Sequence, residues 1–381
     1  MIWFFAEDHK HYTDLERLKK DYNLTNILVM PDLTDIKASI VQANTAVIAP
    51  YLPHKDLKSF FVLVELPNEK GILTSQEIKA NVSEAVALEK RLGLSVIESP
   101  FTLEDLAGAQ PLKDWTEMLL IAEEQGYRAK AVLLVGIPGT GKTFFPKCFA
   151  GHTKRLLIML NLSIIMETAE PIFTLNRVFE YLSYRNRLNP NEKYVILIDE
   201  IEKMIGNSSP QEKRILGRLL TVLNDIHTPA SEYDFNAIFF VTANDLNSII
   251  DNNPELLRRG RFDELFFINL PKDEMAIHAF QIYIKKFGLE MIASNYPIKK
   301  IMMSCDNYYG KDRKVANHFI YTAGEIESFC KQLYFLKLAK SGSINESDIQ
   351  ETITKVIPIW KTAQQGIERM LGQKELFNEC K

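Results

Sequence analysis

The feature that most constrains this chain is a glycine-rich loop between an apolar run and a helix-like segment. Residues 136–143 read GIPGTGKT and directly follow the apolar residues 131–135, AVLLV. This satisfies GxxxxGK[ST], a pattern that binds phosphate when it lies between a strand and a helix. The glycines allow backbone N–H groups to wrap around phosphates, and the helix adds its positive end. The sequence therefore predicts a phosphate site formed by Gly136, Ile137, Pro138, Gly139, Thr140, Gly141, Lys142 and Thr143.

Two residues of this loop carry side-chain chemistry. Lys142 supplies a cation for the β- and γ-phosphates of a nucleotide, and the Thr143 hydroxyl can ligate Mg²⁺. The alternative interpretation is a chance glycine turn before a helix. The strand-like run before the loop, together with the carboxylates described next, favours the phosphate site.

A second apolar run ends in two carboxylates. Residues 194–198, YVILI, are followed by Asp199 and Glu200. At the end of a buried strand Asp199 would hold Mg²⁺, and Glu200 would orient and polarise the water that attacks the γ-phosphate. Both residues could instead cap the next helix, because acidic groups are favourable at its positive end. That alternative explains one carboxylate better than two.

Polar residues with possible roles in hydrolysis follow the next strand-like run. Asn244 comes after residues 237–242, AIFFVT, and can hydrogen bond to the γ-phosphate or the attacking water. Its alternative role is to start a turn, which is common for Asn. Arg258 and Arg261 lie in residues 254–264, PELLRRGRFDE. Such a charge run is usually a solvated face, but an arginine supplied by a neighbour accelerates phosphoryl transfer by about 10³- to 10⁵-fold.

The order of elements predicts an α/β fold with a parallel, doubly wound sheet, because buried-strand candidates alternate with helical segments. The candidate strands are residues 131–135, 156–162, 194–198, 237–242 and 264–268. After Pro271 helical periodicity takes over, in residues 274–286, 323–340, 347–357 and 361–377. We predict a small N-terminal α/β domain over residues 1–96, a nucleotide-binding core over residues 97–270, and a helical lid over residues 271–381.

Composition limits the classes of partner. The chain has 381 residues, and at about 100 to 200 residues per domain this means two or three domains. Lys and Arg total 45 against 49 Asp and Glu, a net charge of −4 that argues against a nucleic-acid partner. The four cysteines are scattered, which fits a reduced compartment. No signal or membrane-spanning segment is visible, so we expect a cytoplasmic protein without a membrane partner.

The motifs together resemble the AAA ATPase family. GIPGTGKT, VILIDE, FFVTAN and PELLRRGRFDE occur in that family's order and at similar spacing. Within the family the chain looks most like the plastid and cyanobacterial hypothetical-open-reading-frame type and its bacterial relatives. Residues 49–53, APYLP, and 63–67, LVELP, are similar to that type's degenerate RecA-like N-terminal domain.

The resemblance implies ATP and Mg²⁺ as ligands and a homo-oligomeric ring, usually a hexamer, with ATP bound between subunits. It implies that Asp199 and Glu200 form the Walker B pair and that Asn244 is sensor 1. Arg258 and Arg261 match arginine fingers that reach the neighbouring subunit. Residues 105–108, DLAG, match the segment that lines the adenine pocket, which makes Leu106 and Gly108 cofactor-binding candidates.

Three functions follow from this resemblance. The first is a ring-forming ATPase that remodels a protein partner or complex, with residues 1–96 selecting the partner. The second is an ATP-dependent nucleic-acid loader or motor, which the acidic net charge disfavours. The third is a nucleotide-gated scaffold with slow turnover, which the presence of Glu200 disfavours. Residues 163–171, SIIMETAEP, contain neither the aromatic residue nor the glycine of a peptide-threading pore loop.

Overall fold

We analysed a computed structural model of the protein. It describes the strands β1 Ile2–Ala6, β2 Asn26–Val29 and β3 Thr45–Pro50, and then residues 92–380. Within that last range, residues 189, 205–208, 229–230, 259, 311–317, 343 and 374–376 are not described. The chain divides into two compact units. The first comprises Met1–Val96, Ile158–Lys193 and Pro210–Ala237, and the second comprises Ile97–Leu157, Tyr194–Ser209 and Ile238–Lys381.

The first unit contains a small parallel sheet in the order β1-β3-β2, in which Ile2 pairs with Ala46 and Asn26 with Thr45. Its helices are α6 Leu162–Met166, α7 Pro171–Leu188 and α8 Pro210–Asp225. The short helix α6 begins at Leu162 because the Asn161 side chain caps it, accepting hydrogen bonds from the N–H groups of Ser163 and Ile164.

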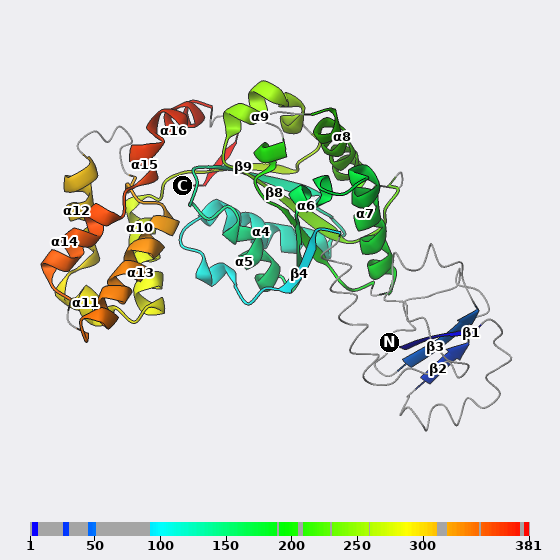
Figure 1. Ribbon diagram of the computed structural model, residues 1–381, viewed down its shortest axis with the longest axis horizontal. Helices are drawn as coiled ribbons and strands as arrows, with labels where there is room; N and C mark the ends of the chain where they lie inside the picture. Colours follow the sequence, from blue (N-terminus) through cyan, green and yellow to red (C-terminus); the bar gives the residue numbers. More distant parts are fainter. Residues whose placement is uncertain are drawn as a thin grey trace. The chain divides into compact units, whose positions relative to one another are not determined.

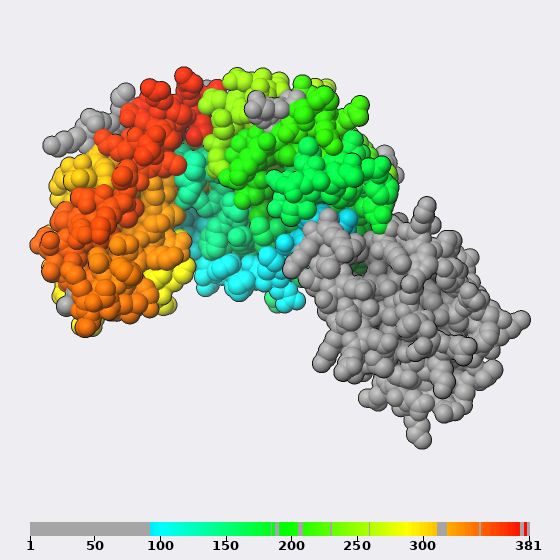
Figure 2. Space-filling model, viewed as in Figure 1, coloured from blue at the N-terminus to red at the C-terminus, as the bar shows by residue number. Residues whose placement is uncertain are grey.

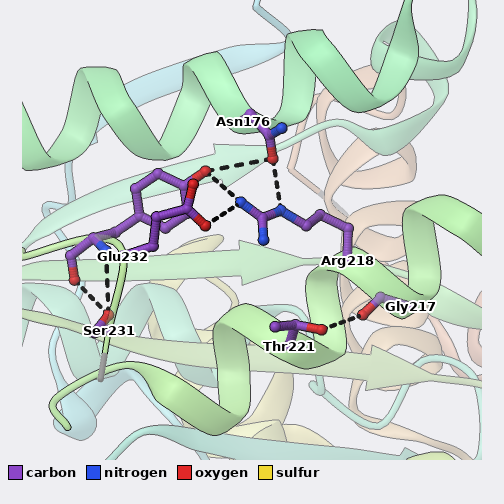
Figure 3. A network of polar contacts seen from close by, with 7 residues as sticks. Asn176, Gly217, Arg218, Thr221, Ser231 and Glu232 are labelled. Atoms are coloured by element: carbon purple, nitrogen blue, oxygen red, sulfur yellow. Dashed lines mark hydrogen bonds and ion pairs between the residues drawn. The ribbon is translucent and has the colours of Figure 1, made fainter. Parts of the chain in front are cut away.

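A polar network connects two helices of this unit. Arg218 of α8 donates from Nε to Oδ1 of Asn176 on α7, at 2.7 Å (Figure 3). The same guanidinium donates from Nη2 to Glu232 at 2.6 Å and to the Tyr233 hydroxyl at 2.7 Å. Because one planar guanidinium satisfies three acceptors, it fixes the segment after α8 relative to both helices.

A larger sheet carries the predicted core. Its strand order is β10-β9-β5-β8-β7-β6-β4. Strand β5, Ala131–Gly136, pairs in parallel with β8, Ala237–Ala243, and with β9, Glu264–Ile268. Every residue of β5, β8 and β7, Tyr194–Ile198, is buried. This confirms the predicted α/β fold, since strands covered on both faces read as continuous apolar runs.

The structure corrects the predicted ends of this sheet. Strand β6 covers Leu156–Leu160, so the predicted strand over residues 156–162 is two residues too long. Strand β4, Leu94–Glu98, lies at one edge. Strand β10, Asn378–Cys380, lies at the other and pairs in parallel with β9. The prediction missed both edge strands.

Aromatic packing joins helices to the sheet within the second unit. Trp115 of α4, Gln110–Glu124, lies 6.0 Å from the ring of Phe149 on α5, Phe144–His152. The Trp115 ring also lies 6.3 Å from Phe240 of β8 and 6.1 Å from Phe266 of β9. Because these rings come from four elements, they pack α4 and α5 against β8 and β9 of the sheet.

The lid follows Pro271 and is helical, as predicted (Figure 1). Phe280, Phe319, Tyr321 and Phe329 form its aromatic core. Figure 2 shows the surface of the lid residues in yellow to red. The predicted helix over residues 361–377 is wrong in extent, because helix breaks at Ala363 and ends at Leu371. The lid helices are α10 Asp273–Lys286, α11 Glu290–Asn295, α12 Ile298–Tyr309, α13 Ala323–Ala339, α14 Glu346–Lys355, α15 Ile359–Thr362 and α16 Gln364–Leu371.

Among the residues that the structure describes, no helix combines the length and apolar character needed to span a bilayer.

Candidate functional site

The glycine-rich loop lies between β5 and α5, as the sequence predicted. Three of its glycines have positive φ, with values of 151° at Gly136, 80° at Gly139 and 96° at Gly141. A Cβ atom on Gly136 would overlap the carbonyl group of Ile268 in β9. Glycine is therefore required at Gly136 both by its backbone conformation and by the close approach of the neighbouring strand.

Lys142 points into this loop. Its side chain is almost fully buried, with the residue 5% exposed, and Nζ donates to the carbonyl oxygens of Gly136 at 2.8 Å and Ile137 at 2.7 Å. Burial lowers the pKa of Lys142 to about 8. A desolvated ammonium that donates to two neutral carbonyl groups is an electrostatic site for an anion, so the loop fits a phosphate group.

The two predicted Mg²⁺ ligands lie side by side. The Thr143 hydroxyl donates to Oδ1 of Asp199 at 2.8 Å. Thr143 precedes the first residue of α5, and Asp199 follows the last residue of β7. A hydroxyl and a carboxylate are the oxygen ligands that Mg²⁺ accepts when phosphates complete its coordination. The residues present therefore fit a magnesium ion bound together with a nucleotide.

Glu200 is held in an unusual backbone conformation. Its φ is 54°, in the left-handed region that non-glycine residues seldom adopt. The Glu200 N–H donates to Oγ1 of Thr242 at 2.9 Å, and the same hydroxyl donates to Oδ1 of Asp199. One threonine of β8 thus binds both residues of the acid pair. We infer that Thr242 stabilises the turn that directs the Glu200 side chain.

The Glu200 carboxylate has two partners. Asn244 donates from Nδ2 to Glu200 Oε1 at 3.1 Å, and Lys203 forms an ion pair with Oε2. The structure therefore brings together the acid pair and Asn244, which the sequence had placed at the ends of separate strands. Hydrogen bonding to Glu200 raises the pKa of Lys203. The amide of Asn244 and the ammonium of Lys203 therefore occupy one oxygen each of the Glu200 carboxylate.

A further carboxylate, Glu202, lies beneath Asn244. It accepts the Asn244 backbone N–H at 3.0 Å. The sequence reasoning did not single out Glu202, Lys203 or Thr242. The first two stand in the string DEIEK immediately after the apolar strand, and that concentration of charge is the signal that could have identified them.

The two predicted finger arginines differ in their surroundings. Arg261 is tied to Glu255, to the backbone oxygen through Nη1 and to Oε2 through Nη2, the latter at 3.2 Å. The Arg261 side chain is 13% exposed. Arg258 is exposed, and its side chain has no hydrogen bond or ion pair within the described ranges. Neither arginine contacts the glycine-rich loop of its own chain through a polar contact in those ranges.

The predicted adenine-pocket residues lie against the loop and the lid. A Cβ on Gly141 would lie 3.8 Å from Cδ1 of Leu106. Gly108 has φ of 64°, and a Cβ there would lie 2.7 Å from the sulfur of Met275 on α10. The segment that carries Leu106 and Gly108 therefore lies against both the glycine-rich loop and helix α10 of the lid. This is the position that the resemblance predicts for an adenine base. Met275 was not identified from the sequence, because only the fold brings it there.

The lid also contacts the loop directly. Gly324, at the start of α13, donates its backbone N–H to the carbonyl oxygen of Gly139 at 2.9 Å. Helix α13 begins with a capping box in which Thr322 and Glu325 satisfy each other's backbone N–H groups. The first turn of α13 is therefore hydrogen-bonded to the loop at Gly139.

Comparison with known proteins identifies the domain that carries this site. Residues 132–270 match the family described as "ATPase family associated with various cellular activities (AAA)". The chain is 29% identical over 324 residues to an "Uncharacterized AAA domain-containing protein ycf46" from Guillardia theta, covering 79% of this chain and 57% of that protein. It is 26% identical over 310 residues to a protein of the same name from Gracilaria tenuistipitata var. liui, covering 76% and 56%.

A more distant relative is a "Proteasome-activating nucleotidase" from Methanocella arvoryzae, 26% identical over 334 residues that cover 82% of this chain and 74% of that protein. The chain spans little more than half the length of the two ycf46 proteins. The family match includes the loop, the acid pair, Asn244 and both arginines. Residues 132–270 therefore match an AAA ATPase domain, as the motifs predicted, and the ycf46 relatives carry the same domain in their names.

Proposed function

We propose that this protein hydrolyses ATP with Mg²⁺ at sites completed between copies of the chain, and that it uses this cycle to remodel a protein partner. One observation carries the proposal. The buried ammonium of Lys142 and the carboxylates of Asp199 and Glu200 belong to one connected site, with Thr143 and Asn244 between them. This combination suits phosphate binding and the activation of water.

Each residue has a distinct role in the proposed reaction. Lys142 and the loop N–H groups bind the phosphates, and Thr143 with Asp199 would hold Mg²⁺. The metal, when bound, neutralises phosphate charge. Glu200 accepts a proton from the attacking water, and Asn244 orients that water or the γ-phosphate. Lys203 and Asn244 occupy the Glu200 oxygens in the structure, so Glu200 must exchange at least one of these contacts to reach the water.

The proposed assembly is a homo-oligomeric ring, most simply a hexamer. It is supported by Arg258, whose exposed side chain is available to a neighbouring subunit. The proposed client is a protein, because a relative is named as a nucleotidase that activates the proteasome. Selection of that client by residues 1–96 remains a prediction that falls largely outside the described residues, and a cytoplasmic location is likewise part of the proposal.

Threading of a polypeptide through the ring is not part of this proposal. Residues 163–171 lack the aromatic residue and glycine of a threading loop. The residues that α6 exposes there are Ser163 and Ile164, neither of which is aromatic. A nucleotide-gated scaffold would bind ATP with slow or no turnover, and a nucleic-acid motor would be stimulated by DNA or RNA. One ATPase assay, run with and without nucleic acid, distinguishes both alternatives from a remodeller: a low rate indicates the scaffold, and stimulation by nucleic acid indicates the motor.

The proposal predicts that the ATPase rate per chain rises with protein concentration and then levels off. The reason is that a site completed by a neighbour is inactive in an isolated chain and becomes active on assembly. The rate of phosphate release should be measured across a wide range of concentration, beside the molecular mass in solution. A rate per chain that does not change while the mass changes would contradict the shared site.

Replacement of Lys142 by Ala is expected to weaken ATP binding by about 10- to 100-fold, because the side chain contributes a charged hydrogen-bond donor to the phosphates. Binding of a fluorescent ATP analogue measures the effect. Lys285→Ala is the matched control, since Lys285 is exposed on α10 of the lid. Unchanged affinity in Lys142→Ala, with the control also unchanged, would show that the loop does not bind the phosphates.

A further inference from the structure

The sensor residue Asn244 is held at two points by glutamates from a single turn. Its side chain donates to Glu200 Oε1 at 3.1 Å, and its backbone N–H donates to Glu202 Oε1 at 3.0 Å. Asn244 directly follows β8, whereas both glutamates follow β7. The contact with Glu202 therefore fixes the position of the Asn244 backbone relative to the residue proposed to activate water.

The turn that carries Glu202 is itself anchored. It is a 3₁₀ helix over Ile201–Met204, and the side chains of Ile201 and Met204 are buried. Between these two buried residues, the Glu202 side chain turns toward Asn244, and the Lys203 side chain is exposed. A hydrogen bond from a fixed turn to the Asn244 N–H leaves that residue little freedom.

Glu202 retains a polar atom that folding alone does not explain. Its Oε2 is buried and has no hydrogen-bond partner within the described part of the chain. Burial raises the pKa of this carboxyl. A buried acceptor without a donor opposes folding, so a residue with a purely structural role would be better satisfied by an apolar side chain or a paired amide.

We propose that Glu202 is a positioning residue for ATP hydrolysis, which holds the backbone of Asn244 so that its side-chain amide faces Glu200 and the γ-phosphate. This inference rests on the proposed ATPase function. Glu202 does not touch the reacting atoms. It acts through Asn244, and its removal lowers the rate of the chemical step more than it lowers the affinity for ATP.

Two substitutions of Glu202 separate its hydrogen bond from its charge. Glu202→Gln keeps an oxygen that can accept the Asn244 N–H, and we expect it to retain kcat within about 3-fold of wild type. Glu202→Met has similar length but no comparable acceptor, and we expect kcat to fall by about 10- to 100-fold with the Kd for ATP nearly unchanged. Glu290→Met, on the exposed start of α11, is the matched control.

Two further measurements exclude a merely structural role. In the nucleotide-free protein, exchange of the Asn244 amide hydrogen should be slow in wild type and Glu202→Gln and faster in Glu202→Met. In an Asn244→Ala background, Glu202→Met should lower kcat by no more than about 3-fold further, because Glu202 acts through the side chain already removed.

The outcomes distinguish this inference from the proposed function. A wild-type protein without ATPase activity contradicts the proposed function, and with it the role of Glu202. An active wild type with an equally active Glu202→Met contradicts only the role of Glu202. So does a kcat loss that is fully additive with Asn244→Ala, or one that accompanies an equal loss of ATP affinity and of thermal stability.

Discussion

Replacing Glu200 by Gln is expected to lower the rate of ATP hydrolysis by about 10²- to 10⁴-fold, the range attributed to general base catalysis. The amide preserves the size of the side chain and can still accept the hydrogen bond from Asn244 Nδ2. It cannot accept a proton from water. ATP binding is expected to persist, because Lys142 and the loop N–H groups remain in place. Phosphate release measures the first effect, and retention of labelled ATP measures the second.

The control for this substitution is Glu290→Gln, which changes an exposed carboxylate in the first turn of α11. It should leave both hydrolysis and binding unchanged. Normal hydrolysis by Glu200→Gln would show that Glu200 does not activate the water. Loss of ATP binding together with hydrolysis would show instead that the substitution disturbs the loop, through the ion pair with Lys203 or the strained turn at Glu200.

The strands inside the sheet could be predicted from the sequence because a strand buried on both faces consists of a continuous run of apolar residues. Strands β5, β7 and β8 are covered on both faces, so their apolar runs are continuous and their limits are clear. Strand β6 was predicted too long because Leu162 is apolar. Leu162 is the first residue of α6, and the polar Asn161 before it caps that helix, so the strand ends with its apolar run at Leu160.

The edge strands could not be predicted in this way. Strand β10 has three residues, Asn378–Cys380, and no apolar periodicity. It is a strand because its backbone pairs with Phe266, Phe267 and Ile268 of β9, more than a hundred residues earlier in the chain. A backbone pairing between distant segments leaves no local signature, and the last predicted helix, over residues 361–377, ended just before this strand.

The residues of the candidate site show the same contrast between local motifs and contacts of distant segments. The sequence singles out Lys142, Thr143 and Asp199 because their motifs fix the local backbone; the structure places Thr143 against Asp199, and the roles of all three in the reaction stay predictions. Thr242 and Glu202 were missed because their contacts join the end of β7 to the end of β8, and these segments are far apart in the sequence. The sequence places Asn244 at a strand end, but only the fold shows that its amide meets Glu200. A residue whose contacts lie within one loop can be recognised from the sequence. A residue whose contacts lie between neighbouring strands can be recognised only in the structure.

Replacing Arg258 by Ala is expected to lower kcat by about 10³- to 10⁵-fold, the range of an arginine that stabilises transferring phosphate from a neighbouring subunit. Arg258 is the better test of this role than Arg261. The Arg261 guanidinium holds Glu255 within its own chain, so its removal also disturbs the local structure. Arg258 is exposed and lacks a side-chain partner in the described residues, so its loss should not affect folding. Arg369→Ala, exposed on α16, is the control.

Mixing two inactive variants decides whether Arg258 acts on a neighbour. Chains with Arg258→Ala keep Glu200, and chains with Glu200→Gln keep Arg258. If each site combines Glu200 of one chain with Arg258 of the next, random co-assembly in equal amounts restores about a quarter of the wild-type activity, since half the chains keep each residue. The two variants should carry different tags, be co-expressed and be purified through both. Mixed assemblies that stay inactive would place both residues in the same chain's site, whereas recovered activity requires that adjacent chains share it.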